Sequence, residues 1–418
     1  MNEYKVRDIS LASKGKRDVE WAESRMPVMR ALTERFRKSK PLKGHVIGGC
    51  LHVTKETAVL VRAIRECGGL PVWSGCNPLS TNDEISAALA AEGINIFAWH
   101  GLSSKEYYWC IDQVLARDPD LTLDDGADLI FTTHSKYKKK AENVIGGTEE
   151  TTTGVHRLRA MADDGALLYP VIAVNDAETK WDFDNIYGTG QSTFDGILRA
   201  TSILIAGKVV VIAGYGHCGK GIASRARGLG AKVIVTEVDP IMALKATMDG
   251  FQVLKMDEAA PLGDLFVTAT GMKDVIRDWH IESMKDGAMF CNSGHYNVEI
   301  NLDELEAIKV SKKDVRPDTE EFTLKKGKKV YLLGQGRLIN LVAAEGHPSE
   351  VMDMSFANQL LSLIYLVKNK GKLKNQVYVV PKEQDAEVAK LKLECMGLSI
   401  DKLTPDQEKY STDYSAGT

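Results

Sequence analysis

The sequence predicts an α/β fold with two doubly wound parallel sheets and a short C-terminal tail. Short apolar runs alternate with helical patterns through both halves of the chain, which is typical of parallel βαβ units. Near the middle of the chain, a glycine-rich turn separates an apolar run from a helical pattern and marks a second α/β unit. The length of 418 residues is sufficient for two or three domains.

The composition is ordinary for a globular protein in water, with 44% hydrophobic and 26% charged residues. A net charge of −4 provides no basic surface, so nucleic acid is not an expected partner. No apolar run reaches the roughly 18 residues of a membrane helix, and the start lacks the apolar segment of a signal peptide. The seven cysteines are scattered without a C-x-x-C pair, which favours a cytoplasmic location and disfavours structural metal sites and disulfides.

The first half of the chain is expected to form one sheet with its own helices. Apolar runs bounded by turn residues predict strands at residues 45–53, 70–74, 94–99, 121–125 and 170–175. Helical periodicity predicts helices at residues 21–37, 57–66 and 83–93.

The second unit starts near Lys208 and is expected to contribute further strands at residues 251–256, 264–270, 288–294 and 329–333. A helical stretch at residues 350–368 differs from this unit and is expected to return to the first domain. We therefore expect a discontinuous substrate domain (residues 1–185 and 347–396), an inserted Rossmann domain (residues 186–346) and a tail (residues 397–418).

The glycine-rich turn has the order strand, turn, helix, strand, acidic residue, which a dinucleotide site requires. Gly214, Gly216 and Gly219 form G-x-G-x-x-G. In order, they permit the tight turn, the approach of the backbone to the pyrophosphate, and close packing of helix on strand. Glu237, at the end of the next strand, can accept both ribose hydroxyls and repel a 2′-phosphate, which favours NAD over NADP. A glycine-rich turn of a flavodoxin-like domain is the alternative.

Polar and ionisable residues gather in short segments outside this turn, where strands end or loops begin. They are His52, Thr54, Glu56, Asp124, Asp125, Asp128, Asn175, Lys180, Asp184, Asn185, His295 and His347. Groups that bind ligands collect at the carboxyl ends of parallel strands. Lys180 and Asp184 share one helix face, and a lysine beside a carboxylate and near a cationic nicotinamide can be tuned as a proton carrier.

Each of these segments also has a structural interpretation. Asp124 and Asp128 can cap a helix and a turn, and Lys180 with Asp184 can be a solvated helix pair. Surface or core roles are the simpler interpretation of the isolated residues His100, His134 and His280 and of the lysines at 136–140. The functional interpretation gains support because all these segments occur in one chain with the glycine fingerprint.

Eight motifs, in order along the chain, carry a resemblance to a known family. They are L-H-V-T-K-E-T, N-P-L-S-T-N-D, L-D-D-G-A-D, E-E-T-T-T-G-V, V-N-D-(x)3-K-(x)3-D-N-(x)-Y-G, G-Y-G-H-C-G-K-G, C-N-S-G-H and E-G-H-P. In these motifs the chain resembles the S-adenosylhomocysteine hydrolase family, over about residues 8–410.

The resemblance implies an enzyme that holds NAD tightly and returns it unchanged. It implies that the ribose 3′-hydroxyl of S-adenosylhomocysteine is oxidised, which acidifies the 4′ C–H. Homocysteine is then eliminated, water adds at the 5′ carbon, and the ketone is reduced to give adenosine. The resemblance also implies a homotetramer with the tail in oligomerisation.

The family motifs imply roles for particular residues. Lys180 is the expected base for the 3′-hydroxyl proton, Asp125 the base at the 4′ carbon, and His52 the proton carrier at the 5′ position. The catalytic set is His52, Asp125, Glu150, Lys180, Asp184 and His295. The substrate contacts are Thr54, Glu56, Asp125, Glu150, Lys180, Asp184, His295, His347 and Met352. The NAD contacts are Thr151, Thr152, Thr153, Asn185, Gly214, Gly216, His217, Cys218, Gly219, Glu237, Asn292 and Asn340, and no metal is expected.

The sequence departs from many members of that family. Thr189 stands where a cysteine is often found near the nicotinamide, Asn82 replaces a common glutamine, and Glu345 replaces an apolar residue. The chain ends at Thr418, soon after Tyr410, and we expect a weaker contact of the tail with a neighbouring subunit's NAD.

Several alternatives remain open from the sequence. Glu56 can accept from the exocyclic amine of adenine, whereas some relatives have a lysine there and suit hypoxanthine, so S-inosyl-L-homocysteine is an alternative substrate. An NAD-dependent hydroxy-acid dehydrogenase would share the fold and would accumulate NADH with product. A regulator that only binds NAD is expected to have lost His52, Asp125 or Lys180, and all three are present.

Overall fold

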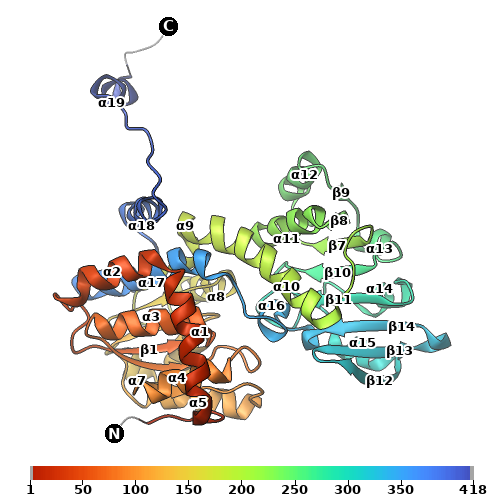
Figure 1. Cartoon of the computed structure of the whole chain (residues 1–418), viewed down its shortest axis with the longest axis horizontal. Helices are drawn as coiled ribbons and strands as arrows, with labels where there is room; N and C mark the ends of the chain where they lie inside the picture. Colours follow the sequence, from red (N-terminus) through yellow and green to blue (C-terminus); the bar gives the residue numbers. More distant parts are fainter. Residues whose placement is uncertain (1–2, 415–418) are drawn as a thin grey trace.

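The computed structural model describes residues 3–414, which form two lobes and a C-terminal tail (Figure 1). Each lobe is built on one parallel-dominated sheet. The chain leaves the first lobe through η3 (Trp181–Gly188) and α10 (Thr189–Thr201), and it returns to that lobe at α17 (Ser349–Lys368).

Seven parallel strands form the sheet of the first lobe. In spatial order they are β15 (Val377–Val379), β6 (Val171–Ala173), β5 (Gly146–Glu149), β4 (Leu121–Asp124), β1 (Val46–Cys50), β2 (Leu70–Ser74) and β3 (Asn95–Phe97). The order of connection reverses between β1 and β4. Such a reversal opens a crevice at the carboxyl ends of the two strands, and this crevice is where open α/β sheets bind ligands.

Helices cover both faces of this sheet, so its strands are buried on each side. One face carries α1 (Ala12–Ser24), α2 (Pro27–Arg37), α3 (Lys55–Glu66), α4 (Asp83–Ala91), α17 and α18 (Lys382–Cys395). The other carries α5 (Ser104–Leu115), α6 (Asp128–Lys136), α7 (Lys138–Ala141) and α8 (Thr152–Asp163). The helix predicted at residues 21–37 is divided, because Pro27 starts α2 as its first residue.

Eight strands form the sheet of the second lobe. In spatial order they are β12 (Lys309–Arg316), β13 (Thr319–Leu324), β14 (Lys329–Leu333), β11 (Ala288–Asn292), β10 (Leu265–Thr268), β7 (Val209–Ala213), β8 (Lys232–Thr236) and β9 (Gln252–Val253). The order reverses between β7 and β10, which places a second crevice after these two strands.

Helices also cover this second sheet on both faces. One face packs against α10, α11 (His217–Gly228), α12 (Pro240–Met248) and α16 (Ile339–Val342). The other packs against α13 (Met256–Ala259), α14 (Asp278–Ser283) and α15 (Leu302–Ile308).

Several features of the sheets were not predicted from the sequence. At one edge of the second sheet, β12 pairs antiparallel with β13, and β13 pairs antiparallel with β14. β12 is exposed and lysine-rich, so it lacks the continuous apolar run by which buried parallel strands are found. In the first sheet, β5 has the sequence GGTE, which also lacks an apolar run although all four residues are buried.

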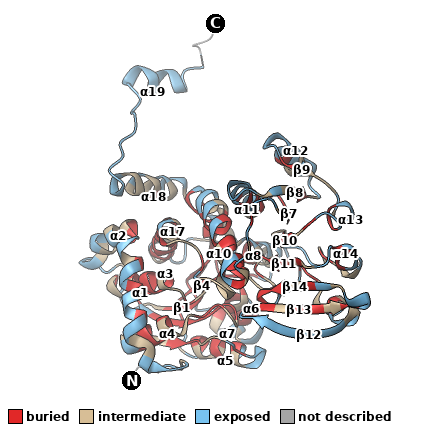
Figure 2. Ribbon diagram, turned by 45° about the vertical axis from the view of Figure 1, so that its right-hand side comes forward, coloured by how far each residue is buried: buried red, intermediate tan, exposed pale blue. Residues whose placement is uncertain are grey.

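The C-terminal helix α19 (Pro405–Thr412) stands away from both lobes, beyond α18 (Figure 1). Figure 2 shows it exposed along its length, in contrast to the buried centres of the two lobes. Among the helices of residues 3–414, none has the length and apolar character needed to cross a membrane.

Candidate active site

A cavity of about 330 Å³ lies between the lobes, at the crevices of both sheets. It brings together most of the residues that the sequence predicted for substrate and cofactor. These are His52, Thr54, Glu56, Asp125, Glu150, Thr151, Thr152, Thr153, Lys180, Asp184, Asn185, Gly216, His217, Cys218, His295, Asn340, His347 and Met352.

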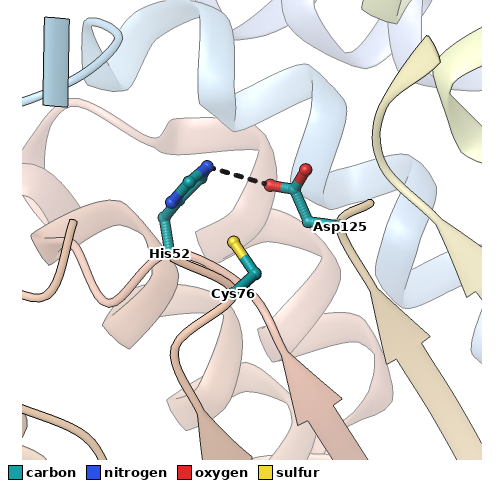
Figure 3. Close-up of side chains that lie close together, drawn as sticks. All are labelled: His52, Cys76 and Asp125. Atoms are coloured by element: carbon teal, nitrogen blue, oxygen red, sulfur yellow. Dashed lines mark ion pairs between the residues drawn. The ribbon is translucent and has the colours of Figure 1, made fainter. Parts of the chain in front are cut away.

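His52 and Asp125 face each other in this cavity (Figure 3). They follow the adjacent strands β1 and β4, and their separation is 3.4 Å between His52 Nε2 and Asp125 Oδ2. Burial lowers the pKa of His52 to about 3, and the charge of His347 acts in the same direction. The imidazole is therefore neutral near pH 7, with one nitrogen that accepts and one that donates.

Ser80 fixes the orientation of the His52 ring. Its Oγ lies 2.6 Å from His52 Nδ1, and Ser80 is itself buried. With Nδ1 held in this way, Nε2 is the ring nitrogen directed toward Asp125.

Asp125 also has a second imidazole beside it, since Oδ1 lies 3.6 Å from His295 Nδ1. Burial raises the pKa of Asp125, although the charges of His295 and Lys180 oppose that effect. A carboxylate with a raised pKa is a stronger base than one in water.

The neighbouring carboxylates hold the loop that carries Asp125. Asp124 accepts the backbone N–H of Ile130 at 2.7 Å, and Asp128 pairs with Arg157 at 2.7 Å. Glu149 accepts two further backbone N–H groups, and burial raises its pKa. The geometry thus supports the structural interpretation of Asp124 and Asp128.

Lys180 lies at the centre of a buried polar cluster on the chain that connects the lobes. Its Nζ is 2.8 Å from Asp184 Oδ2 and 2.8 Å from Asn185 Oδ1. The hydrogen bonds of η3 are π-helical, which places residues four and five apart on one face. Asp184 also forms an ion pair with His347 Nδ1. This is a buried site and not a solvated helix pair.

The opposite charges in this cluster stabilise one another's ionised forms. Burial alone would lower the pKa of Lys180, but Asp184 and Glu150 raise it above its ordinary value. Burial alone would raise the pKa of Asp184, but His347 and Lys180 hold it below its ordinary value. In this state Lys180 is an ammonium group at neutral pH.

Glu150 is anchored by two polar residues of α17. Ser355 Oγ donates to Oε1, and Gln359 Nε2 donates to Oε2 at 2.5 Å. Burial raises the pKa of Glu150 to about 7, against the opposing charge of Lys180. Its carboxyl therefore gains or loses a proton near neutral pH.

Glu56 lies at the other end of the cavity, near the return of the chain to the first lobe. It is 1% exposed, and its Oε1 accepts from Ser349 Oγ at 2.6 Å. Lys55 Nζ lies 3.3 Å from the same oxygen and 3.0 Å from Glu345 Oε2. Thr54 caps α3 by accepting from a backbone N–H of its first turn.

The glycine turn between β7 and α11 fits a dinucleotide. Gly214 has φ +95°, and a Cβ on Gly219 would lie only 1.9 Å from Gly214 O, whereas a Cβ on Gly216 would meet nothing within 4 Å. Gly216 thus leaves space before the helix N-terminus, where a phosphate binds. Asn340 Oδ1 and Thr153 Oγ1 are buried cavity atoms without a hydrogen-bond partner in residues 3–414. Polar atoms of this kind are available to a ligand.

Four predicted cofactor residues lie outside the cavity lining. Gly214 and Gly219 shape the turn. Glu237 stands at the end of β8, where its carboxylate accepts backbone N–H groups, including that of Tyr215 at 2.6 Å. The Asn292 amide makes five hydrogen bonds, three with Gly294 and Tyr296 of its own loop and one each with Thr268 and Gly336.

Sequence reasoning missed four supporting residues: Ser80, Ser349, Ser355 and Gln359. Ser355 and Gln359 had a detectable signal, because they are polar residues four positions apart in the mainly apolar helix 350–368. Ser80 lies in a loop and Ser349 lies at the start of a helix. The sequence around them does not indicate which side chains they contact.

Comparisons with known proteins agree with this geometry. The family described as "S-adenosyl-L-homocysteine hydrolase" matches residues 3–137, and the description "S-adenosyl-L-homocysteine hydrolase, NAD binding domain" matches residues 185–346. A solved structure of a dipicolinate synthase chain from Bacillus halodurans has a TM-score of 0.50 and 15% identity. It covers 78% of this chain and 99% of its own, and this likeness concerns the fold alone.

Curated relatives are similar over their whole length. An adenosylhomocysteinase of Aeropyrum pernix is 58% identical, over 97% of this chain and 98% of its own. One of Saccharolobus solfataricus is 56% identical, over 99% and 100%. An S-inosyl-L-homocysteine hydrolase of Methanocaldococcus jannaschii is 54% identical, also over 99% and 100%. The chain belongs to the S-adenosyl-L-homocysteine hydrolase family.

Proposed function

We propose that this protein hydrolyses S-adenosyl-L-homocysteine reversibly to adenosine and L-homocysteine, with tightly bound NAD. The observation that carries the proposal is one cavity that joins the glycine turn to His52, Asp125 and Lys180. When bound, NAD supplies reversible oxidation at the ribose 3′ carbon, which makes the 4′ C–H acidic. A simple dehydrogenase needs a proton carrier at the hydroxyl only, whereas this cavity has further carriers for the 4′ and 5′ carbons.

Lys180 and Asp184 would hold the ribose hydroxyls, with Lys180 taking the proton of the 3′-hydroxyl. The raised pKa of Lys180 opposes proton release in the structure described here. A cationic ligand bound in the same cavity opposes the effect of the carboxylates on the pKa of Lys180, and it therefore favours release of the proton.

Asp125 and His52 would carry the remaining protons. Asp125 takes the 4′ proton, which moves to the departing homocysteine sulfur as the bond from sulfur to the 5′ carbon breaks. The oxygen of water then bonds to the 5′ carbon, and one of its protons returns to the 4′ carbon. His52 is neutral and lies 3.4 Å from Asp125, so it can transfer protons at the 5′ position.

The other predicted residues complete the proposed substrate and cofactor contacts. We assign Glu150 and His295 to the ribose, Thr54 and Glu56 to the purine, and His347 to the purine or homocysteine end. Met352 completes the substrate contacts. The NAD contacts that we propose are Thr151, Thr152, Thr153, Asn185, Gly214, Gly216, His217, Cys218, Gly219, Glu237, Asn292 and Asn340.

Synthesis from the products tests this function. Holoenzyme incubated with adenosine and homocysteine should form S-adenosylhomocysteine without net NADH, as measured by chromatography and absorbance. Failure to form the thioether while NAD stays bound contradicts the proposal. NADH that accumulates in proportion to an oxidised product would support a dehydrogenase instead.

S-inosyl-L-homocysteine is the second candidate substrate, because relatives with that name are 53–54% identical to this chain. Glu56 favours the adenosyl compound, since a carboxylate accepts from the exocyclic amine of adenine but repels the oxygen of hypoxanthine. We expect the adenosyl compound to react faster at equal concentration. Comparable turnover of the inosyl compound would contradict this assignment.

The larger organisation is also a proposal. We infer that residues 1–185 and 347–396 act as the substrate domain, residues 186–346 as the NAD domain and residues 397–418 as an oligomerisation tail. A homotetramer in the cytoplasm is the assembly and location that we propose, and light scattering of the purified protein tests the assembly by its mass.

A further inference from the structure

A buried thiol lies beside the His52–Asp125 pair (Figure 3). One ligand atom of Cys76 and one from each of the other two residues lie within 4.8 Å of one another. Cys76 is 4% exposed, and its Sγ makes no hydrogen bond with any part of the chain that the structure describes. The steps proposed for the hydrolysis leave Cys76 without a role.

We propose that His52, Cys76 and Asp125 form an inhibitory site for Zn²⁺. Two ligands of a tetrahedral zinc ion, bound at about 2.0–2.2 Å, are about 3.4 Å apart. His52 Nε2 and Asp125 Oδ2 are separated by 3.4 Å. A thiolate bound at about 2.3 Å would lie about 3.6 Å from each of these atoms, so a shift of Cys76 Sγ by about 1 Å completes the set.

The surroundings of the three residues also match those of a metal site. A zinc-bound histidine usually donates its other ring N–H to an oxygen, and here Ser80 Oγ lies 2.6 Å from His52 Nδ1. With Nδ1–H donating to Ser80, the lone pair of Nε2 is directed toward Asp125. His295 flanks the opposite oxygen of Asp125, at 3.6 Å, and supports that carboxylate.

The three types of ligand atom favour a metal ion of borderline softness. A thiolate, an imidazole and a carboxylate suit Zn²⁺, whereas Mg²⁺ requires an octahedral shell of oxygens. His52 and Asp125 line the cavity, so the fourth position of a tetrahedral ion faces the space for substrate. A bound ion would occupy the two groups to which we assign proton transfer at the 4′ and 5′ positions, and turnover would stop. The inference goes beyond the proposed function, because metal binding does not depend on it.

Titration of the holoenzyme with ZnCl₂ in a calorimeter tests the binding. Cys76→Ser should weaken the affinity for zinc by at least about tenfold, since even residues behind the ligands contribute about 10–100-fold. Ser80→Ala should also weaken it, by about 10–100-fold. Cys67→Ser is the matched control, because Cys67 is a buried cysteine in the apolar core and outside the cluster. It should leave the affinity unchanged, and MgCl₂ should give no binding.

Cobalt provides a second measurement that depends on the thiolate. Holoenzyme loaded with Co²⁺ should show a thiolate-to-metal charge-transfer band that is present in Cys67→Ser and absent in Cys76→Ser. Equal zinc affinity in all variants, or a cobalt spectrum without that band, would overturn the proposal. Initial rates of hydrolysis should fall with zinc and recover with a chelator. If the protein has no hydrolase activity, the two binding measurements still decide the metal site.

Discussion

At the scale of single residues, burial and partners give identical side-chain types different properties. Asp184 has a lowered pKa because His347 and Lys180 surround it, whereas burial raises the pKa of Asp125 and Glu150. A lowered pKa suits a fixed negative charge that binds hydroxyls or an ammonium group. A raised pKa suits a group that takes and returns a proton.

Lys180 provides a direct test of the proposed proton transfer. We expect Lys180→Ala and Lys180→Arg to lower kcat by about 10²–10⁴-fold, because the first lacks the proton carrier and a guanidinium does not release its proton near pH 7. NAD content, measured after protein denaturation, should stay at the wild-type level. The control Lys136→Ala alters an exposed lysine and should leave kcat unchanged. Wild-type turnover in Lys180→Ala would show that the assignment of the base is wrong.

Glu150 is expected to make stability depend on pH. Its pKa is about 7 in the folded protein and ordinarily 4.5, so the folded state binds the proton more tightly. This contribution is complete below pH 4.5 and disappears as the pH rises through 7. The free energy of unfolding of the wild type, relative to Glu150→Gln, should fall by up to about 3 kcal/mol across that range. Denaturant unfolding at several pH values measures it, and a difference that is constant with pH would contradict the pKa shift.

The sequence predicted the residues that carry charge in recognisable motifs, and the structure places His52, Asp125 and Lys180 in one cavity. The sequence did not predict which side chains fix the positions of these three residues. Ser80 lies 28 positions from His52, and only the fold shows that their side chains meet. Nor did the sequence show that the Asn292 amide donates to the backbone carbonyls of Tyr296 and Gly336.

At the scale of elements, helix α11 shows how close packing determines the glycine turn. A Cβ on Gly219 would lie 1.9 Å from Gly214 O, whereas a Cβ on Gly228, in the same helix, would meet nothing within 4 Å. We expect Gly219→Ala to displace the turn and lower NAD content. Gly228→Ala should retain NAD, and by limiting the unfolded chain it should be neutral or slightly stabilising. Equal NAD content in the two variants would contradict this account of the turn.

The strands differ in how well their positions can be predicted from the sequence. Strands buried on both faces carry continuous apolar runs, so β1, β2, β7, β10 and β14 were located close to their observed bounds. β5 is buried but consists of small and polar residues, and β12 lies exposed at a sheet edge. Their positions follow from pairing with neighbouring strands, which the local sequence does not encode.

At the scale of the whole molecule, polar contacts join the two lobes. Tyr296 Oη of the second lobe donates to Gly126 O of the first at 2.8 Å, and Arg157 donates to the same Tyr296 oxygen at 2.8 Å. The adjacent His295 packs against Gly126, where a Cβ would lie 2.5 Å from its Nε2. The cavity residues of the first lobe therefore meet those of the second only when the lobes are together, as expected for a site that must exclude water during part of its cycle.

The tail provides a prediction about assembly. α19 and the segment before it expose the apolar residues Leu398, Ile400, Leu403 and Tyr410, although they contact neither lobe closely in the single chain. Such a surface favours burial against a second copy. Leu403→Asp with Tyr410→Asp should reduce the mass measured by light scattering, whereas Lys402→Ala with Lys409→Ala should not. An unchanged mass in the first variant would contradict an oligomerisation role of the tail.

The central claim is that oxidation at the 3′ carbon serves to release the 4′ proton for a net hydrolysis. The most direct measurement is the exchange of the 4′ hydrogen when holoenzyme and adenosine are incubated in D₂O. We predict that recovered adenosine carries deuterium at the 4′ position without accumulation of NADH, and that Asp125→Asn greatly slows this exchange. Recovered adenosine without 4′ deuterium, or NADH formed in proportion to a ketone product, would contradict the account.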